Sequence, residues 1–116
     1  MKFPVIELVD RYCIAVVKFE KTHGANNEEL RFYEAQIAHL DRAIIQKHLD
    51  ALYEIHYRIW NMEDDFKKCR IDGAPLEEIG RRALEIRDLN NHRVETKNKI
   101  AELVGDSVRE IKQYNA

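Results

Sequence analysis

Apolar residues recur at steps of three and four along almost the whole chain, which is the spacing of one buried face of an α-helix. The pattern predicts three helices. The first begins near Pro4 and ends before His23 and Gly24. The second starts at about Asn27 and runs nearly unbroken to Ile71, because neither Gly nor Pro interrupts it.

The third predicted helix follows a turn at Asp72-Gly73 and runs from Pro75 to about Val104. Proline suits the first turn of a helix, where its missing N–H would have no partner anyway. Two endings fit the pattern. Either Gly105 breaks the helix before a short last helix that Ser107 and Glu110 cap, or the helix continues without a break.

Folding the chain at these turns predicts an all-α fold, in which a long antiparallel helical hairpin and an N-terminal helix form a three-helix bundle at one end. The 116 residues make a single helical domain, 1–116. The N-terminal helix is expected to run antiparallel to the first half of the second helix. This arrangement places Asp10 near Leu40 and Val5 near Ile45.

The other end of the hairpin is predicted to contain two helices only, and it carries the aromatic residues Tyr57, Trp60 and Phe66. Two helices cover such a stripe incompletely, and large exposed apolar patches mark interaction sites. We therefore expect a homodimer through the Tyr57/Trp60/Phe66 end, with another protein as a possible partner.

Three polar residues, Asn90, Arg93 and Lys97, interrupt the apolar face of the third helix. Buried charge is costly unless it is paired. The facing part of the second helix supplies no acid, whereas the first helix does. We therefore predict that Arg93 is largely buried and paired with Asp10 or Glu7.

His56 and Glu63 lie on the apolar face of the second helix, close to Trp60. Under one interpretation, His56 and Asn90 form a polar layer that fixes the register of the hairpin. Under the other, His56, Glu63 and the polar residues of the third helix line a ligand pocket, whose Arg and Lys bind a carboxylate or a phosphate. The pattern alone leaves both open.

Glu63 and Asp64 are weak metal-ligand candidates, because paired carboxylates on a helix can hold Mg²⁺. The facing stretch of the third helix is rich in arginine, including Arg82 and Arg87, which favours ion pairs instead. We expect no metal or cofactor, and no residue is assigned a catalytic role.

Charge and composition indicate which partners and which cellular location to expect. Basic and acidic residues number 19 and 21 and are interspersed, which argues against a nucleic-acid partner. No run approaches the ~18 apolar residues of a membrane span. Glu7, Asp10 and Arg11 interrupt any signal-peptide core, and two cysteines are too few for a disulfide framework. A cytoplasmic protein is therefore expected.

Three stretches, residues 7–12 with Lys18, residues 59–64, and residues 89–93 with Lys97, resemble an uncharacterised family of short helical bacterial proteins and domains. That family is found among lipopolysaccharide and capsule biosynthesis genes. It shows an E-L-[IV]-D-[KR] opening, a W-x-[IM]-E-D core and an L-N-x-x-R-x-x-x-K run. Where it usually has Asn, this chain has His56. The resemblance implies that the motif residues matter here too: Glu7, Asp10, Lys18, Trp60, Glu63, Asp64, Asn90, Arg93 and Lys97.

Two functions are consistent with these features. The first is a dimeric, non-enzymatic helical accessory or interaction module, which the resemblance links to bacterial surface-polysaccharide synthesis. The second is a small-molecule binding protein for a phosphorylated or nucleotide-linked sugar, or a metal-dependent phosphohydrolase. In the second, Arg93 and Lys97 bind the anion, and Glu63 or Asp10 serves as metal ligand or base.

Overall fold

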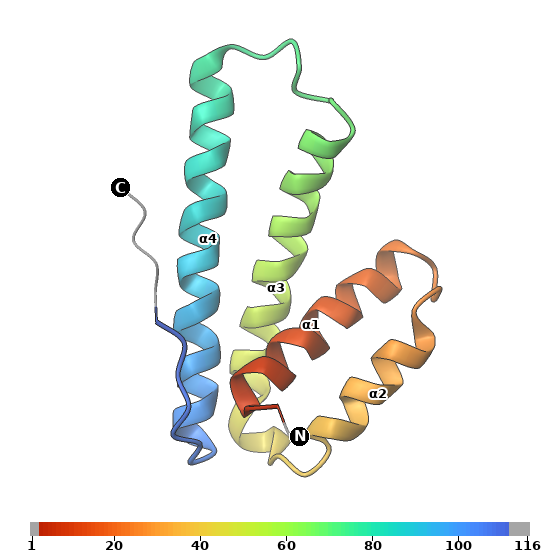
Figure 1. Cartoon of the computed structure of the whole chain (residues 1–116), viewed down its shortest axis with the longest axis vertical. Helices are drawn as coiled ribbons and strands as arrows, with labels where there is room; N and C mark the ends of the chain where they lie inside the picture. The colour runs from red at the N-terminus through yellow and green to blue at the C-terminus, as the bar shows by residue number, and fades with distance from the viewer. Residues whose placement is uncertain (1–2, 112–116) are drawn as a thin grey trace.

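The computed structural model describes residues 3–111, and within this range it contains four α-helices and no strand (Figure 1). They are α1 (Val5–Lys21), α2 (Asn27–Ile37), α3 (Arg42–Lys67) and α4 (Leu76–Leu103). Successive helices reverse direction, and α3 and α4 form the long antiparallel hairpin (Figure 1). The all-α fold class and the hairpin are therefore confirmed.

The prediction of one nearly unbroken helix from Asn27 to Ile71 is wrong. The helix stops at Ile37, and Ala38–Asp41 turn the chain before α3 starts. Asp41 is the N-cap of α3, and its side chain accepts a hydrogen bond of 3.0 Å from the Ala43 amide. A capping carboxylate satisfies an amide that has no partner within the helix, so it marks a helix start without Gly or Pro.

The break changes which residues face the core. The unbroken pattern placed Ile44 and His48 on the buried face, but Ile44 is 50% exposed. The positions that follow them, Ile45 and Leu49, are buried instead. Because α2 folds back, Ile37 and Ile45 enter the same core cluster from two different helices.

The break also reverses the direction of α1 relative to the long helix. With α2 running back, α3 runs in the same general direction as α1 (Figure 1). Asp10 therefore lies beside His56 of α3. Further along both helices, Lys21 donates a 2.5 Å hydrogen bond to Asn61.

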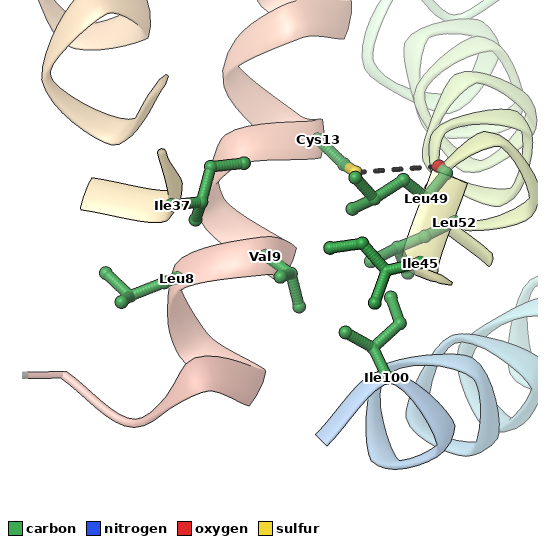
Figure 2. Packing of buried hydrophobic residues seen from close by; sticks show 8 residues of the cluster. All are labelled: Leu8, Val9, Cys13, Ile37, Ile45, Leu49, Leu52 and Ile100. Carbon is green, nitrogen blue, oxygen red and sulfur yellow. Dashed lines mark hydrogen bonds between the residues drawn. The ribbon is translucent and has the colours of Figure 1, made fainter. Parts of the chain in front are cut away.

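The main core surrounds α1, with Ile37 of α2 on one side and residues of α3 and α4 on the other (Figure 2). The Cys13 thiol adds a 3.8 Å hydrogen bond to the Leu49 carbonyl oxygen, and burial raises the pKa of this thiol well above its ordinary value. Eight buried residues make up the cluster: Leu8, Val9, Cys13, Ile37, Ile45, Leu49, Leu52 and Ile100.

Helix α2 packs against α1 and against no other described helix. Its one buried residue is Ile37. It extends the bundle sideways, so α1, α3 and α4 alone enclose the region where the polar residues gather.

The chain reverses after α4. Gly105 has a φ of +78°, a backbone conformation that favours glycine, and residues 106–111 then run back beside α4 (Figure 1). The predicted break at Gly105 is therefore present, but no helix follows it within the described residues. We call residues 106–111 the C-terminal strap.

The aromatic residues of α3 are closer to α1 than predicted. The Lys21 ammonium lies 4.5 Å from the centre of the Tyr57 ring, and Trp60 shares a cavity with Ile14 and Val17. Tyr57, Trp60 and Phe66 are each half-buried. The two-helix end of the hairpin therefore begins beyond Trp60, because α1 crosses α3 diagonally.

Within the described range, no helix is long and apolar enough to cross a membrane.

Candidate functional site

Asp10 is the centre of a buried charge cluster between α1, α3 and α4. Its side chain projects from the buried face of α1 and is 6% exposed as a residue. One carboxylate oxygen lies 2.7 Å from His56 Nε2. The other accepts hydrogen bonds from Arg93 Nη1 at 2.7 Å and from Lys97 Nζ at 3.5 Å. The predicted pairing of Arg93 with Asp10 is confirmed.

Arg93 and Lys97 reach the same carboxylate because they lie one turn apart on α4. The Arg93 side chain is 21% exposed, so it is largely buried as predicted, and Lys97 is 1% exposed. A second acid, Glu110 of the C-terminal strap, forms an ion pair with Lys97 and lies 3.9 Å from Arg93 Nη2. The cluster thus pairs two acidic side chains with two basic side chains and His56.

Burial alone would raise the Asp10 pKa, because desolvation disfavours the charged form. The hydrogen bond from His56 and the charges of His56, Arg93 and Lys97 outweigh this effect and hold the pKa below its ordinary value. Asp10 is therefore a permanent carboxylate at neutral pH. A carboxylate held this firmly is a poor proton acceptor.

The polar layer of His56 and Asn90 that would fix the hairpin register does not form as a direct contact. His56 bonds to Asp10, whereas the Asn90 amide donates to the Ile86 carbonyl oxygen at 3.1 Å. Asn90 also accepts a 3.3 Å hydrogen bond from Arg93 Nε. In the described chain, Asn90 thus orients the guanidinium that binds Asp10, and no hydrogen bond joins it to His56.

A cavity of about 310 Å³ opens beside the cluster. Its wall combines apolar side chains of α1 and α3 with polar and aromatic ones, a mixture that is typical of small-molecule sites. Five sequence-predicted residues line it, His56, Trp60, Glu63, Asn90 and Arg93, together with Ile14, Val17, Ile59 and Lys67.

Other predicted residues lie away from this cavity. Glu7 pairs with Arg11 on α1 at 3.5 Å, and Lys18 pairs with Glu29 of α2 at 3.3 Å. Both pairs are largely exposed, and such pairs contribute little to stability. The resemblance groups Glu7 and Lys18 with Asp10, but the structure separates them from the cluster.

The acidic residues near the C-terminal end of α3 form ion pairs with basic residues. Asp64 lies 3.0 Å from Arg70, and Asp65 lies 3.2 Å from Arg82 across the hairpin. The expected ion pairs are thus present, although Arg82 contacts Asp65 and not Glu63. Within residues 3–111, no group of three His, Cys, Asp or Glu side chains is placed to hold a metal ion.

Two residues of the site were not predicted as ligand contacts. Lys67 lies on the cavity wall two turns from Trp60, a spacing that helix periodicity alone could have indicated. Glu110 was considered only as a capping residue. No local pattern identifies it, because the strap must first turn back along α4.

No family model, curated protein or solved structure gives a significant match to this chain. The function of the protein must therefore be inferred from the geometry of the described residues and from the motifs of the sequence.

Proposed function

We propose that the protein is a binding module for a phosphorylated or nucleotide-linked sugar, whose sugar phosphate enters the cavity between α1, α3 and α4. The observation that carries this proposal is that one cavity is lined by four residues predicted from the sequence as site residues: Trp60, Glu63, Asn90 and Arg93. The resemblance to a family linked to bacterial surface-polysaccharide synthesis supports this ligand class.

The chemistry of the wall suits such a ligand. The Trp60 ring offers a flat apolar face for the C–H face of a sugar ring, and Glu63 can accept hydrogen bonds from sugar hydroxyls. Within the described chain, Glu63 and Lys67 have no ion-pair partner, although both line the cavity. A carboxylate and an ammonium without partners are free to bind a polar ligand.

Arg93 retains donors for an anion. Its Nη1 binds Asp10, its Nε binds Asn90, and its Nη2 lies 3.9 Å from Glu110, beyond hydrogen-bond distance, so Nη2 keeps N–H groups for an anion. Together with Lys67 this provides two cations on one wall. The volume of about 310 Å³ is at the lower end for ligand sites, which fits one sugar phosphate.

Binding, and not hydrolysis, is the function that these residues support. The charge of the Asp10 carboxylate is balanced by its basic neighbours, and Asp64 and Asp65 form ion pairs with arginines.

Cys13 and Cys69 are free thiols, which suits a reducing compartment, and we propose the cytoplasm as the location.

Hexose 1-phosphates and nucleotide sugars are expected to raise the melting temperature in a thermal-shift assay. A ligand at 100 times its Kd adds about 2.7 kcal/mol to the free energy of unfolding. Trp60→Ala and Lys67→Met should abolish the shift, because they remove the stacking face and a cation outside the buried cluster.

Lys68→Met is the matched control, since Lys68 pairs with Asp64 and does not line the cavity. It should leave the ligand shift intact. If none of the sugar phosphates stabilises the wild-type protein, the proposed ligand class is wrong.

A second candidate is a homodimeric interaction module. Two leucines of α4 near the hairpin turn, Leu76 and Leu84, are 85% and 51% exposed. A second copy would cover them together with Phe66, the predicted aromatic residue nearest this end. Sedimentation of the wild type is expected to show a dimer that Leu84→Glu dissociates. A wild-type monomer at micromolar concentration would exclude this candidate.

A further inference from the structure

The C-terminal strap brings a carboxylate to two cations of α4. Glu110 forms an ion pair with Lys97, whose side chain is 2% exposed, and lies 3.9 Å from Arg93 Nη2. Asp10 is 3.5 Å from Lys97 Nζ, a long contact compared with its 2.7 Å bond to Arg93. Glu110 is therefore the closer counter-ion of Lys97.

The strap is held by polar contacts. Asn98 of α4 donates to the Glu110 carbonyl oxygen at 2.7 Å and accepts from the Glu110 amide at 2.9 Å. Asp106 accepts a 3.2 Å hydrogen bond from the Val5 amide. The apolar residues Val108 and Ile111 are 42% and 87% exposed. Hydrophobic burial thus contributes little to docking, and water can replace the hydrogen bonds.

Release of the strap would leave an imbalance of charge. Arg93 and Lys97 would share one carboxylate, Asp10, and a buried ammonium without its nearest counter-ion is costly. Another anion at the Glu110 position would remove that cost. A cavity of about 400 Å³ adjoins this position, and Arg87, Asn91 and Glu110 are among its lining residues.

We propose that Arg93 and Lys97 form a phosphate-binding site, which Glu110 occupies when the strap is docked and which a phosphate group opens by displacing it. A phosphate carries more negative charge than a carboxylate and accepts charge-assisted hydrogen bonds from both arginine and lysine. The proposal rests on the contacts of Glu110 and does not depend on the sugar cavity.

Hydrogen exchange of the wild-type protein tests displacement directly. Inorganic phosphate is expected to speed exchange at the Glu110 amide, which Asn98 protects in the docked form. Glucose 1-phosphate in a parallel sample distinguishes free phosphate from a phosphorylated ligand as the source. Sodium chloride at equal ionic strength should have a much smaller effect.

Two variants release the strap by different means. Glu110→Gln removes the competing charge, and Asn98→Ala removes the two hydrogen bonds and leaves every charge in place. Each should lower the apparent Kd for inorganic phosphate at least about fivefold, because the apparent Kd falls as the open fraction rises. Glu102→Gln is the control, since Glu102 pairs with Lys99 outside the strap. Its Kd should equal that of the wild type.

Equal phosphate affinity in the wild type, Glu110→Gln and Asn98→Ala would overturn the proposal, as would strap exchange that phosphate does not change. Glu110 would then be a structural ion pair only. If one strap variant fails to fold, the other and the wild-type exchange data decide. Strap release by inorganic phosphate, without any stabilisation by hexose phosphates, would support this site and contradict the proposed function.

Discussion

Replacing Asp10 by alanine is expected to lower the free energy of unfolding by about 3–5 kcal/mol, the usual cost of removing one partner from a buried ion pair. The substitution leaves Arg93 and the nearly inaccessible Lys97 with Glu110 as their one remaining acid in the described cluster. His56 also loses its 2.7 Å hydrogen bond. Urea denaturation followed by circular dichroism measures the change.

Glu7→Ala, on the same helix, is the matched control. Glu7 pairs with Arg11 at the surface, and exposed pairs contribute about 0–1 kcal/mol. A loss in Asp10→Ala no larger than in Glu7→Ala would show that the cluster does not stabilise the fold.

The pH dependence of stability gives a second readout of the same prediction. The folded-state pKa of Asp10 lies below its ordinary value of 3.8. Its contribution to stability is therefore fully present above that value and is lost as the pH falls through the lower folded-state pKa. Asp10→Asn should remove this part of the acid dependence.

Ile45→Ala is expected to lower the free energy of unfolding by about 2–5 kcal/mol, because Ile45 is 0% exposed and truncation leaves a cavity in the main core. Ile44→Ala, one residue earlier, should change it by less than about 0.5 kcal/mol, as is usual for surface positions. Chemical denaturation of both variants tests where α3 begins. A continuous helix in the predicted register would reverse the order of the two effects.

The sequence predicted the helical class, the hairpin turn and the ends of α1 well, because Pro4, Gly24 and Pro75 mark where helices begin or end. It did not reveal the break at residues 38–41. The apolar spacing continues through Ile37, Leu40 and Ile44 as if the helix were unbroken. The signal for a new helix is the Asp41 side chain, but one aspartate without a neighbouring Gly or Pro did not stand out from the exposed polar positions of the pattern.

The candidate site was likewise predicted only in part from the sequence. Arg93 and Asp10 were matched from sequence, because a cation on a buried face needs an acid and the first helix offered one. Glu110 was not matched. Its place depends on the reversal at Gly105 and on the side chain of Asn98, which are contacts between residues far from any shared local pattern.

The order in which the chain is synthesised gives the cluster a further consequence. Asp10 is 83 residues from Arg93 and 87 from Lys97, and Val5 is 101 residues from Asp106. During translation, α1, α2 and α3 leave the ribosome before Arg93 and Lys97 of α4 do, so the Asp10 carboxylate has His56 as its one partner of the cluster until α4 has been made. A nascent chain can therefore assemble its first three helices, but the charge of its buried Asp10 is balanced only after α4 has followed them.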